Sequence, residues 1–570
     1  MKRKSILLAG ALAGAFLSGC GDLEENPYSI VVKSNYFQTK EDVIRATLRT
    51  YDQAYSSLSV SFEFQEDASD EMMTPNRQGH WLDGQYYYRL HYHTWTPLDR
   101  FASDTWNALY LGIAQANNSM EDLQLLDTGK FGFTEQEIKQ FIAELRVFRA
   151  WYHLRLLDYY RNIVISTSYK DADLQQTQSS SAETVAFIEK EIHEAVADLP
   201  LRGANTNGRW TKAAAMSLLA RLYLNAGVYT GTDRFTDCAV VCQEILDGKY
   251  GTYSLDPRWD GPFDYDNHLS PETLFAFPSR LGFASYHYTG GIYNMCIPYL
   301  AASYFQAQTA VSTNFKFALQ PGRDVDSVEY SFALGKPLIK FQKYPDDVRT
   351  KVYKNLGDSR REGMFLWGYL VNPATGVRIK GTKGYDYYIR DQVGIFNRLV
   401  GTEQVSYGPG EGHLNPDKQS DMTHADENSG VFVVKYPYYP TSDGNSLESD
   451  YAEIRLAEIY YSLAECKFRS GNKAEAAALL NAVRKRYYPA GSPSLYSSDG
   501  SELTEQELLD EWGREFLAEG RRRTDLIRFD KFTKGTWWDK QPDPDDHTNI
   551  MPIGQSVLLV SPQLKQNPGY

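Results

Sequence analysis

Several features that mark common protein classes are scarce in this sequence. Its 570 residues include only five cysteines, too few for a disulfide framework. Lys and Arg number 59 against 73 Asp and Glu, so the formal net charge is −14 and no overall field attracts nucleic acid. After the N-terminus, no stretch is long and apolar enough to cross a bilayer. The sequence also has no glycine-rich phosphate loop and no nucleophile elbow, so neither motif points to an enzyme.

What the sequence does have is the composition of a folded protein with an excess of aromatic residues. Hydrophobic residues make up 42% and charged residues 23%, which is ordinary globular usage. Aromatic residues reach 14%, with 41 Tyr and 10 Trp. The chain is therefore expected to bury a sizeable core, with aromatic side chains left over for other roles.

The first twenty residues have the layout of an export signal. Three basic residues at positions 2–4 precede a short apolar stretch over residues 6–16, and Leu17-Ser18-Gly19-Cys20 follows. An apolar run this short does not span a membrane as a mature helix. The ending resembles the bacterial lipobox, in which the cysteine is acylated, with palmitate among the acyl chains, and becomes the mature N-terminus. We expect residues 1–19 to be a signal peptide and Cys20 to be the lipid anchor; an ordinary signal peptide that happens to contain Cys20 is the alternative.

Apolar residues recur at helical spacing in several segments of the chain. This pattern predicts helices over residues 41–58, 99–123, 135–160, 181–199, 211–226 and 237–246. Trp106 falls on the apolar face of the second segment, so we assign it to the core. Pro200 stops the fourth helix, and Gly227 is expected to be the residue in the left-handed conformation that ends the fifth.

An internal repeat links two of these helical regions. Leu219-Ala220 and Ala226-Gly227 match Leu463-Ala464 and Ser470-Gly471, each 244 residues further on. A second Ala-rich helix follows in both places, over residues 237–246 and 473–486. The pattern is typical of tetratricopeptide-like hairpins, which need neighbours to bury their faces. Chance similarity between Ala-rich helices is the alternative.

Two regions lack sustained periodicity. Residues 60–98 and about 250–450 are rich in Gly, Pro, Tyr, Asp and Ser, and only short alternating runs such as residues 431–436 suggest strands. Irregular regions of this length within a compact protein are usually functional. The sequence thus predicts a mostly α fold: a tetratricopeptide-like helical repeat scaffold with a large irregular, loop-rich ligand-binding region and few short strands.

Four helical motifs and the C-terminal residues, in this order along the chain, resemble the SusD/RagB family. They are residues 143–152 (AELRVFRAWY), 208–223 (GRWTKAAAMSLLARLY), 455–484 (beginning RLAEIY), 515–528 (EFLAEGRRRTDLIR) and 566–570 (QNPGY). Each is weak alone, but the ordered set covers almost all of the chain after the signal peptide. Cys466 stands where the family usually has Ala, a small-for-small change from which we expect no effect.

The resemblance implies a division of the chain and a function. It implies a signal peptide (1–19), a tether (20–40), an N-terminal region with helical repeats (41–250), an irregular aromatic-rich region (251–450) and a C-terminal helical region (451–570). It also implies a lipoprotein of the outer membrane, facing the cell exterior, that captures oligo- or polysaccharide. Such a protein acts as the lid of a SusC-like TonB-dependent transporter, without catalysis, cofactor or metal. The acidic residues just after Cys20 are similar to those that accompany export to the outer face in lipoproteins of glycan-degrading bacteria.

Aromatic side chains in the irregular segments are the candidate sugar-binding surface. A sugar ring packs its C–H face on an aromatic plane, and its hydroxyl groups need polar side chains around the rim. No motif fixes individual residues. We expect Trp81 to be the main platform, with Tyr293 and Tyr388 as further platforms and Asp67 and Arg361 as polar contacts. Three other candidates lie close to Trp81 in the sequence: Tyr86, Tyr88 and Trp95.

Other residue patterns leave alternatives open. The carboxylates of Glu66, Asp67, Asp70 and Glu71 could form the acid pair of a glycoside hydrolase, although a solvated loop or a loop that hydrogen-bonds a sugar fits them better. His91 and His93 could share one metal ion, but no third ligand follows at a fixed spacing. A surface binder of peptides is the other alternative function. The sequence does not identify the glycan.

Overall fold

The computed structural model describes most of the chain after residue 36. The described residues are 37–77, 80–173, 175–279, 292–293, 296, 302–305, 316–356, 361–381, 386–393, 398–400, 403–405, 420–423, 425–437 and 449–570. The predicted signal peptide (1–19) and the predicted lipid anchor Cys20 lie outside them. Among the described residues, no helix combines the length and apolar character needed to cross a membrane.

The chain divides into a small unit and a large unit. The described part of the small unit comprises residues 37–46 and 127–134. There the ammonium group of Lys40 donates a hydrogen bond to the carbonyl of Gly132 at 3.0 Å and lies 4.5 Å from the ring centroid of Phe133. The large unit comprises residues 47–126 and 135–570.

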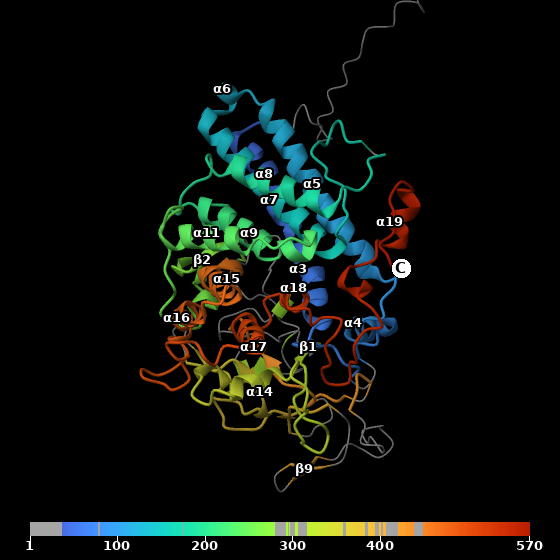
Figure 1. Ribbon diagram of the computed structural model, residues 1–570, viewed down its shortest axis with the longest axis vertical. Coiled ribbons are helices and arrows are strands. Elements are labelled where there is room, and N and C mark those ends of the chain that lie inside the picture. Colours follow the sequence, from blue (N-terminus) through green and yellow to red (C-terminus); the bar gives the residue numbers. More distant parts are fainter. Residues whose placement is uncertain are drawn as a thin grey trace, which may run out of the picture. The chain divides into compact units, whose positions relative to one another are not determined.

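Helices dominate the structure (Figure 1). The α-helices are α3 (Lys40–Asp67), α4 (Tyr86–Tyr92), α5 (Arg100–Gln124), α6 (Thr128–Phe131), α7 (Glu135–Tyr160), α8 (Ser181–Ala195), α9 (Lys212–Leu224), α10 (Ala226–Thr230), α11 (Phe235–Leu246), α13 (Ala302–Phe305), α14 (Pro337–Gln342), α15 (Leu456–Arg469), α16 (Lys473–Arg484), α17 (Glu505–Phe516), α18 (Arg522–Arg528) and α19 (Gln555–Val560). Short 3-10 turns are η1 (Asp83–Gln85), η2 (Gly261–Phe263), η3 (Asn267–Leu269), η5 (Val348–Thr350) and η6 (His547–Asn549). The six predicted helices are confirmed, with shifts at several of their ends.

Two of the sequence expectations about local structure are wrong. Helix α3 continues to Asp67 and α4 follows at Tyr86–Tyr92, so much of the segment 60–98 is helical rather than irregular. Gly227 does not end its helix: α9 ends at Leu224, Gly227 lies within α10, and Gly231 takes the left-handed conformation at φ 74°. A Cβ atom on Gly227 would stand 2.1 Å from Oδ1 of Asp233, so a larger residue there would displace this exposed side chain.

The predicted repeat forms two hairpins that pack against each other. Helices α9 and α11 form one hairpin and α15 and α16 the other, and α11 also packs on α15 (Figure 1). Cys238 and Cys242 are buried on α11 with their sulfur atoms 3.9 Å apart, and Cys466 is buried on α15. Helix α7 packs between α5 and α8 in the same way. Neighbouring hairpins therefore bury each other's apolar faces, as helical repeats require.

The described strands form two-stranded antiparallel sheets. They are β1 (Met72–Met73) with β3 (Ala318–Leu319), β2 (Thr273–Phe277) with β12 (Tyr451–Arg455), β4 (Lys354–Asn355) with β5 (Arg361–Glu362), β6 (Phe365–Leu366) with β11 (Phe432–Val433), β7 (Gly368–Tyr369) with β8 (Tyr388–Ile389), and β9 (Arg398–Val400) with β10 (Glu403–Val405). The predicted strand at 431–436 is confirmed as the short β11. Pairing of β2 with β12 joins the early part of the irregular region to the start of the C-terminal helical region.

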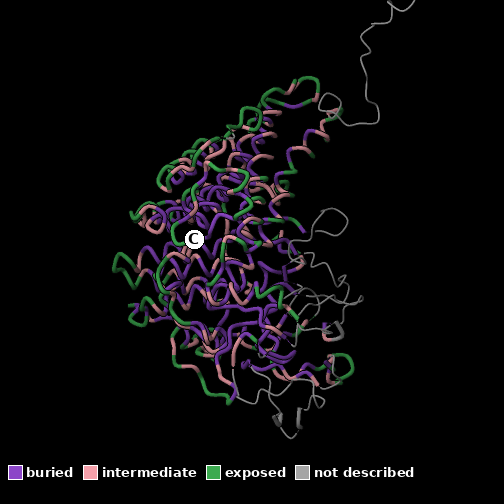
Figure 2. The backbone as a smooth tube through the Cα atoms, turned by 90° about the vertical axis from the view of Figure 1, so that its right-hand side faces the viewer, coloured by how far each residue is buried: buried purple, intermediate pink, exposed green. Residues whose placement is uncertain are grey.

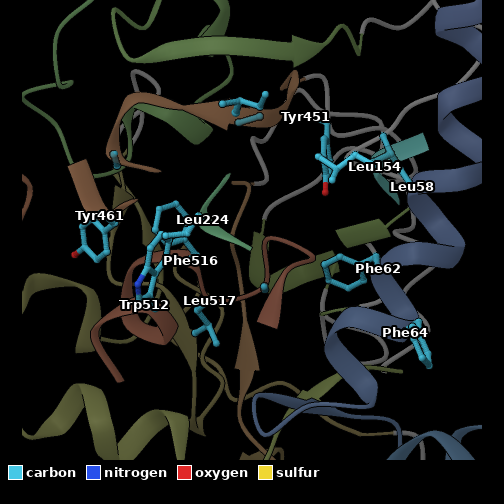
Figure 3. Close-up of a cluster of buried hydrophobic side chains, with 14 of the residues drawn as sticks. Leu58, Phe62, Phe64, Leu154, Leu224, Tyr451, Tyr461, Trp512, Phe516 and Leu517 are labelled. Atoms are coloured by element: carbon cyan, nitrogen blue, oxygen red, sulfur yellow. The ribbon is translucent and has the colours of Figure 1, made fainter. Parts of the chain in front are cut away.

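One core cluster runs through the large unit. It combines residues from α3, such as Phe62, with Trp512 and Phe516 of α17 (Figure 3). The rings of Trp210 and Phe275 stack at 3.9 Å between centroids. Trp106 is 6% exposed and packs on Tyr160, which confirms its assignment to the core. Exposed residues concentrate at turns, with buried stretches between them (Figure 2).

Candidate functional site

Five of the eight predicted binding residues are buried. Their exposed fractions are between 1% and 5%, and the residues are Asp67, Tyr86, Trp95, Tyr293 and Arg361. Trp95 donates its indole N–H to the hydroxyl of Tyr570 at 2.7 Å, and Tyr293 donates its hydroxyl to the carbonyl of Ala518 at 2.7 Å. A ring that is covered on both faces by protein has no surface for a sugar. These aromatic residues therefore belong to the core, contrary to the sequence expectation.

Asp67 and Arg361 are also held inside the protein. Asp67 accepts a hydrogen bond from the hydroxyl of Thr74 at 2.8 Å, and burial raises its pKa to about 8. Arg361 donates to the carbonyl of Val434 at 2.6 Å, and its guanidinium lies 4.8 Å from the ring centroid of Trp259. Neither side chain is available as a polar contact. The sequence was misleading here because α3 extends past the end of its clear periodic pattern and carries Asp67 into the core.

The acidic run at the end of α3 and just after it does not form a hydrolase site on the surface. The carboxylates of Glu66, Asp67, Asp70 and Glu71 are all buried. Glu66 accepts from the backbone N–H of Gly520 at 2.7 Å, and Asp70 accepts from Arg522 at 2.6 Å. These carboxylates anchor the C-terminal motif at residues 515–528 to the end of α3.

The two histidines near Trp81 face different partners. His91 Nε2 lies 2.6 Å from Oδ1 of Asp539, whereas His93 Nδ1 lies 2.7 Å from Oδ2 of Asp543. Burial lowers the pKa of His93 to about 4, so its ring is neutral at ordinary pH. Within the described ranges, no group of three or more His, Cys, Asp or Glu side chains is arranged to hold a metal ion.

Trp81 is half-buried and stands in a strained loop. It has φ 66°, and Asp83 and Gln85 also take positive φ values of 36° and 67°. The ammonium group of Lys316 lies 5.7 Å from the Trp81 ring centroid and 4.6 Å from that of Tyr87. Backbone strain of this kind is concentrated at ligand sites, because only surrounding structure can maintain it. Trp81 remains a candidate platform, as does the half-buried Tyr88 nearby.

A pocket lies in the irregular region of the chain. It has a volume of about 570 Å³, and we call it the tyrosine hollow. Helix α13, strands β4, β5 and β7 and the turns beside them line it with Tyr304, Phe305, Lys351, Val352, Tyr353, Lys354, Asn355, Glu362, Tyr369, Val371 and Pro373. Tyr304 and Tyr369 are half-buried. None of these lining residues was among those predicted from the sequence.

Tyr388 connects the sequence prediction to this hollow. Strands β7 and β8 pair Tyr369 directly with Tyr388, and their ring centroids are 4.8 Å apart at an angle of 68°. The guanidinium of Arg378 lies 3.7 Å from the ring centroid of Tyr369. Tyr388 is half-buried, whereas its neighbour Tyr387 is fully buried, because side chains alternate between the two faces of a strand. That alternation is the one local signal that separates the two tyrosines.

The hollow combines the two kinds of group that sugars need. Tyrosine rings offer apolar faces, and Asn355, Glu362 and two lysines supply polar groups at the rim. Lys351 forms an ion pair with Glu362 at 2.6 Å. Burial raises the pKa of Tyr304 to about 12, so its hydroxyl stays neutral and can donate to the carbonyl of Tyr353. An arrangement of aromatic rings and rim polar groups is suited to binding.

Two family models match the chain. Residues 377–570 match the SusD family, and residues 22–224 match a family described as starch-binding and associating with the outer membrane. A relative is the starch-binding protein SusD of Bacteroides thetaiotaomicron, 26% identical over 506 residues, which are 86% of this chain and 82% of that protein.

Solved structures show the same fold. A SusD homologue from Bacteroides thetaiotaomicron has a TM-score of 0.67 at 18% identity, covering 94% of this chain and 98% of that one. A laminarin-binding SusD-like protein has a TM-score of 0.63 at 20% identity, covering 94% of this chain and 100% of that one. The helical scaffold and its irregular insertion thus occur together in other proteins.

Proposed function

Because the chain belongs to the SusD family, we propose that it is a glycan-binding lipoprotein of the outer membrane that faces the cell exterior. It captures oligo- or polysaccharide without cleaving it and delivers it to a SusC-like TonB-dependent transporter, over which it acts as a lid. The names of two relatives, one starch-binding and one laminarin-binding, support a glycan as the ligand.

The observation that carries the proposal is the pair of tyrosines, packed edge to face, at the tyrosine hollow. Tyr369 and Tyr388 are held in register by β7 and β8, so their rings are fixed before any ligand arrives. Preorganised aromatic rings lose little side-chain entropy on binding. The half-buried Trp81 is a second platform of the proposed binding surface.

The decisive experiment is a binding screen with product analysis on the same samples. Purified protein is titrated calorimetrically with polysaccharides and with peptides, and new reducing ends are measured. We expect heat from a glycan and no new reducing ends. Heat from peptides alone would establish the peptide-binding alternative, and new reducing ends would establish a hydrolase.

Tyr369→Ala tests the location of the site. Loss of one stacking platform should weaken glycan binding by about 1–3 kcal/mol, which is about tenfold or more. The matched control is Tyr169→Ala, because Tyr169 is 53% exposed and lies far from the hollow in the sequence. Equal affinity of both variants and the unchanged protein would place the site elsewhere, and Trp81→Ala would then be the next variant to titrate.

The anchor is tested separately. Cys20→Ala should release the protein from the outer membrane into a soluble fraction, because acylation at Cys20 is the proposed tether. A variant that stays with the membrane would rule out Cys20 as the sole attachment. Co-purification of the unchanged protein with an outer-membrane transporter from solubilised membranes tests the proposed partner.

A further inference from the structure

The segment that lines the tyrosine hollow has the opposite charge to the rest of the protein. Residues 351–390 contain eight Lys and Arg but three Asp and Glu, a net charge of +5 in a chain whose net charge is −14. A local excess of positive charge in an acidic protein attracts anions to that place alone. The described cations of this segment either make contacts inside the protein or lie at the hollow.

Some of the cations in this segment are used inside the protein. Arg390 is buried and forms an ion pair with Asp426 at 2.8 Å. Arg361 is buried and donates to a backbone carbonyl, as described above. These two side chains contribute to packing and cannot meet a ligand.

Four other cations stand at or beside the hollow, with two carboxylates between them. Lys351 is paired with Glu362, and Arg378 and Lys380 share the single carboxylate of Asp386. Hydrogen bonding from Lys380 lowers the pKa of Asp386, so that carboxylate stays ionised.

Lys354 is the exception among these cations. It is exposed, it lines the hollow, and none of the carboxylates in the described part of the chain lies within 4 Å of its ammonium group. Arg378 adds a second positive group against the face of Tyr369. Arg378 is paired with Asp386, but among the described lining residues Lys351 and Lys354 stand against the single carboxylate of Glu362, so the lining has aromatic rings together with one excess positive charge.

We propose that the tyrosine hollow selects an acidic glycan, whose rings stack on the tyrosines while a carboxylate or sulfate group pairs with Lys354. This rests on the proposed function and narrows its substrate class. The contact between an ammonium group and an anion is strengthened when both also donate or accept hydrogen bonds. A neutral glycan can stack equally well but leaves Lys354 with water.

The experiment compares matched glycans that differ only in charge. The full mature protein is titrated with oligogalacturonate and with its methyl ester, and separately with chondroitin sulfate and desulfated chondroitin, at low and at high salt. We expect at least one acidic probe to bind about tenfold tighter than its matched control at low salt, with the preference falling as salt rises. The two pairs distinguish carboxylate from sulfate as the recognised group.

A charge variant completes the test. Lys354→Gln should weaken binding of the preferred acidic probe about three- to tenfold and leave the neutral probe unchanged. The control is Lys485→Gln, because Lys485 is exposed at the end of α16, outside the hollow. Neutral glycans that bind as tightly as acidic ones, or an acidic preference that survives Lys354→Gln, would overturn the inference and leave the proposed function standing. Failure of every glycan to bind would reject the proposed function itself.

Discussion

The C-terminal helical region and the tyrosine hollow both contain basic side chains, but these side chains have different surroundings. In the first, Arg455 is 2% exposed and contacts Glu515 at 2.6 Å and Glu519 at 2.8 Å. In the second, Lys354 is exposed, and none of the carboxylates among the described residues lies within 4 Å of its ammonium group, since the cross-strand Glu362 pairs with Lys351. The difference lies in compensation: buried charges are tolerated where partners surround them, whereas we propose that the exposed Lys354 pairs with a ligand.

In the C-terminal helical region, buried carboxylates such as Glu515 and Glu458 are paired with arginine side chains. Burial alone would raise the pKa of Glu515, but Arg455 and Arg486 lower it to about 2. Glu458 is likewise held at about 2 by Arg221 and Arg521 despite its burial. These carboxylates remain ionised under all ordinary conditions, so the network stabilises one arrangement of α15, α17 and β12.

The largest expected effect comes from opening this network. Arg455→Ala should lower the free energy of unfolding by about 3–5 kcal/mol, because the buried carboxylates of Glu272, Glu515 and Glu519 each lose one of their cations. Denaturant unfolding measures the change. Lys354→Ala is the matched comparison and should shift stability by less than about 0.5 kcal/mol, as expected at an exposed site. Similar losses for both variants would contradict the distinction between the two regions.

A second comparison is between Trp106, which is in the core, and Trp81, which is half-buried. Trp106→Ala should cost about 3–5 kcal/mol, because it leaves a cavity in the core beside Tyr160. Trp81→Ala removes a half-buried ring and should leave the melting temperature within a few degrees of the unchanged protein. Thermal unfolding of both variants, followed by glycan titration of Trp81→Ala, checks the prediction. A Trp81→Ala protein that unfolds as readily as Trp106→Ala would assign Trp81 to the core.

The last comparison is between two buried carboxylates three residues apart, Asp67 and Asp70. Asp70→Asn should cost about 3 kcal/mol, because Arg522 loses the charge that it pairs with at 2.6 Å. Asp67 instead has a pKa raised to about 8 by burial, so at neutral pH the folded protein holds a proton there that the unfolded chain releases.

The sign of the pH effect follows from that proton. Between about pH 4 and pH 8 the contribution of Asp67 to stability falls as pH rises, since the unfolded carboxyl ionises near pH 4. Asp67→Asn removes this dependence, so the variant should gain stability relative to the unchanged protein between pH 5 and pH 8. Denaturant unfolding at the two pH values measures it, and an unaltered pH slope would show that Asp67 is ionised in the folded state.

Much of the scaffold could be predicted because helices are encoded locally. Residues 135–160 were identified to the residue as a helix, since a long run of apolar side chains at a spacing of three and four leaves no other solution. The repeat at an interval of 244 residues was also visible, because both hairpins need the same small residues at their contacts. The end of α3 was missed since Glu66 and Asp67 look solvated until their partners are known.

The proposed binding surface could not be predicted in the same way. The sequence around Tyr293 and Tyr388 does not distinguish their roles. Tyr293 donates its hydroxyl to the carbonyl of Ala518 in the core, whereas Tyr388 packs on Tyr369 beside the hollow. Tyr369 and Lys354 carried no periodic signal at all. Their significance depends on which strands pair with them.

The sequence by itself therefore determined the helical scaffold and the family resemblance, because spacing along one chain is enough to specify an amphipathic helix. Only the tertiary structure decided which aromatic and charged side chains are open to a ligand. Exposure is a property of what packs against a residue, and the packing partners here come from hundreds of positions away: Arg522 meets Asp70, and Arg455 meets Glu272. At Lys354 the described residues supply no carboxylate within 4 Å, and we propose that an anionic group of a ligand pairs with it instead.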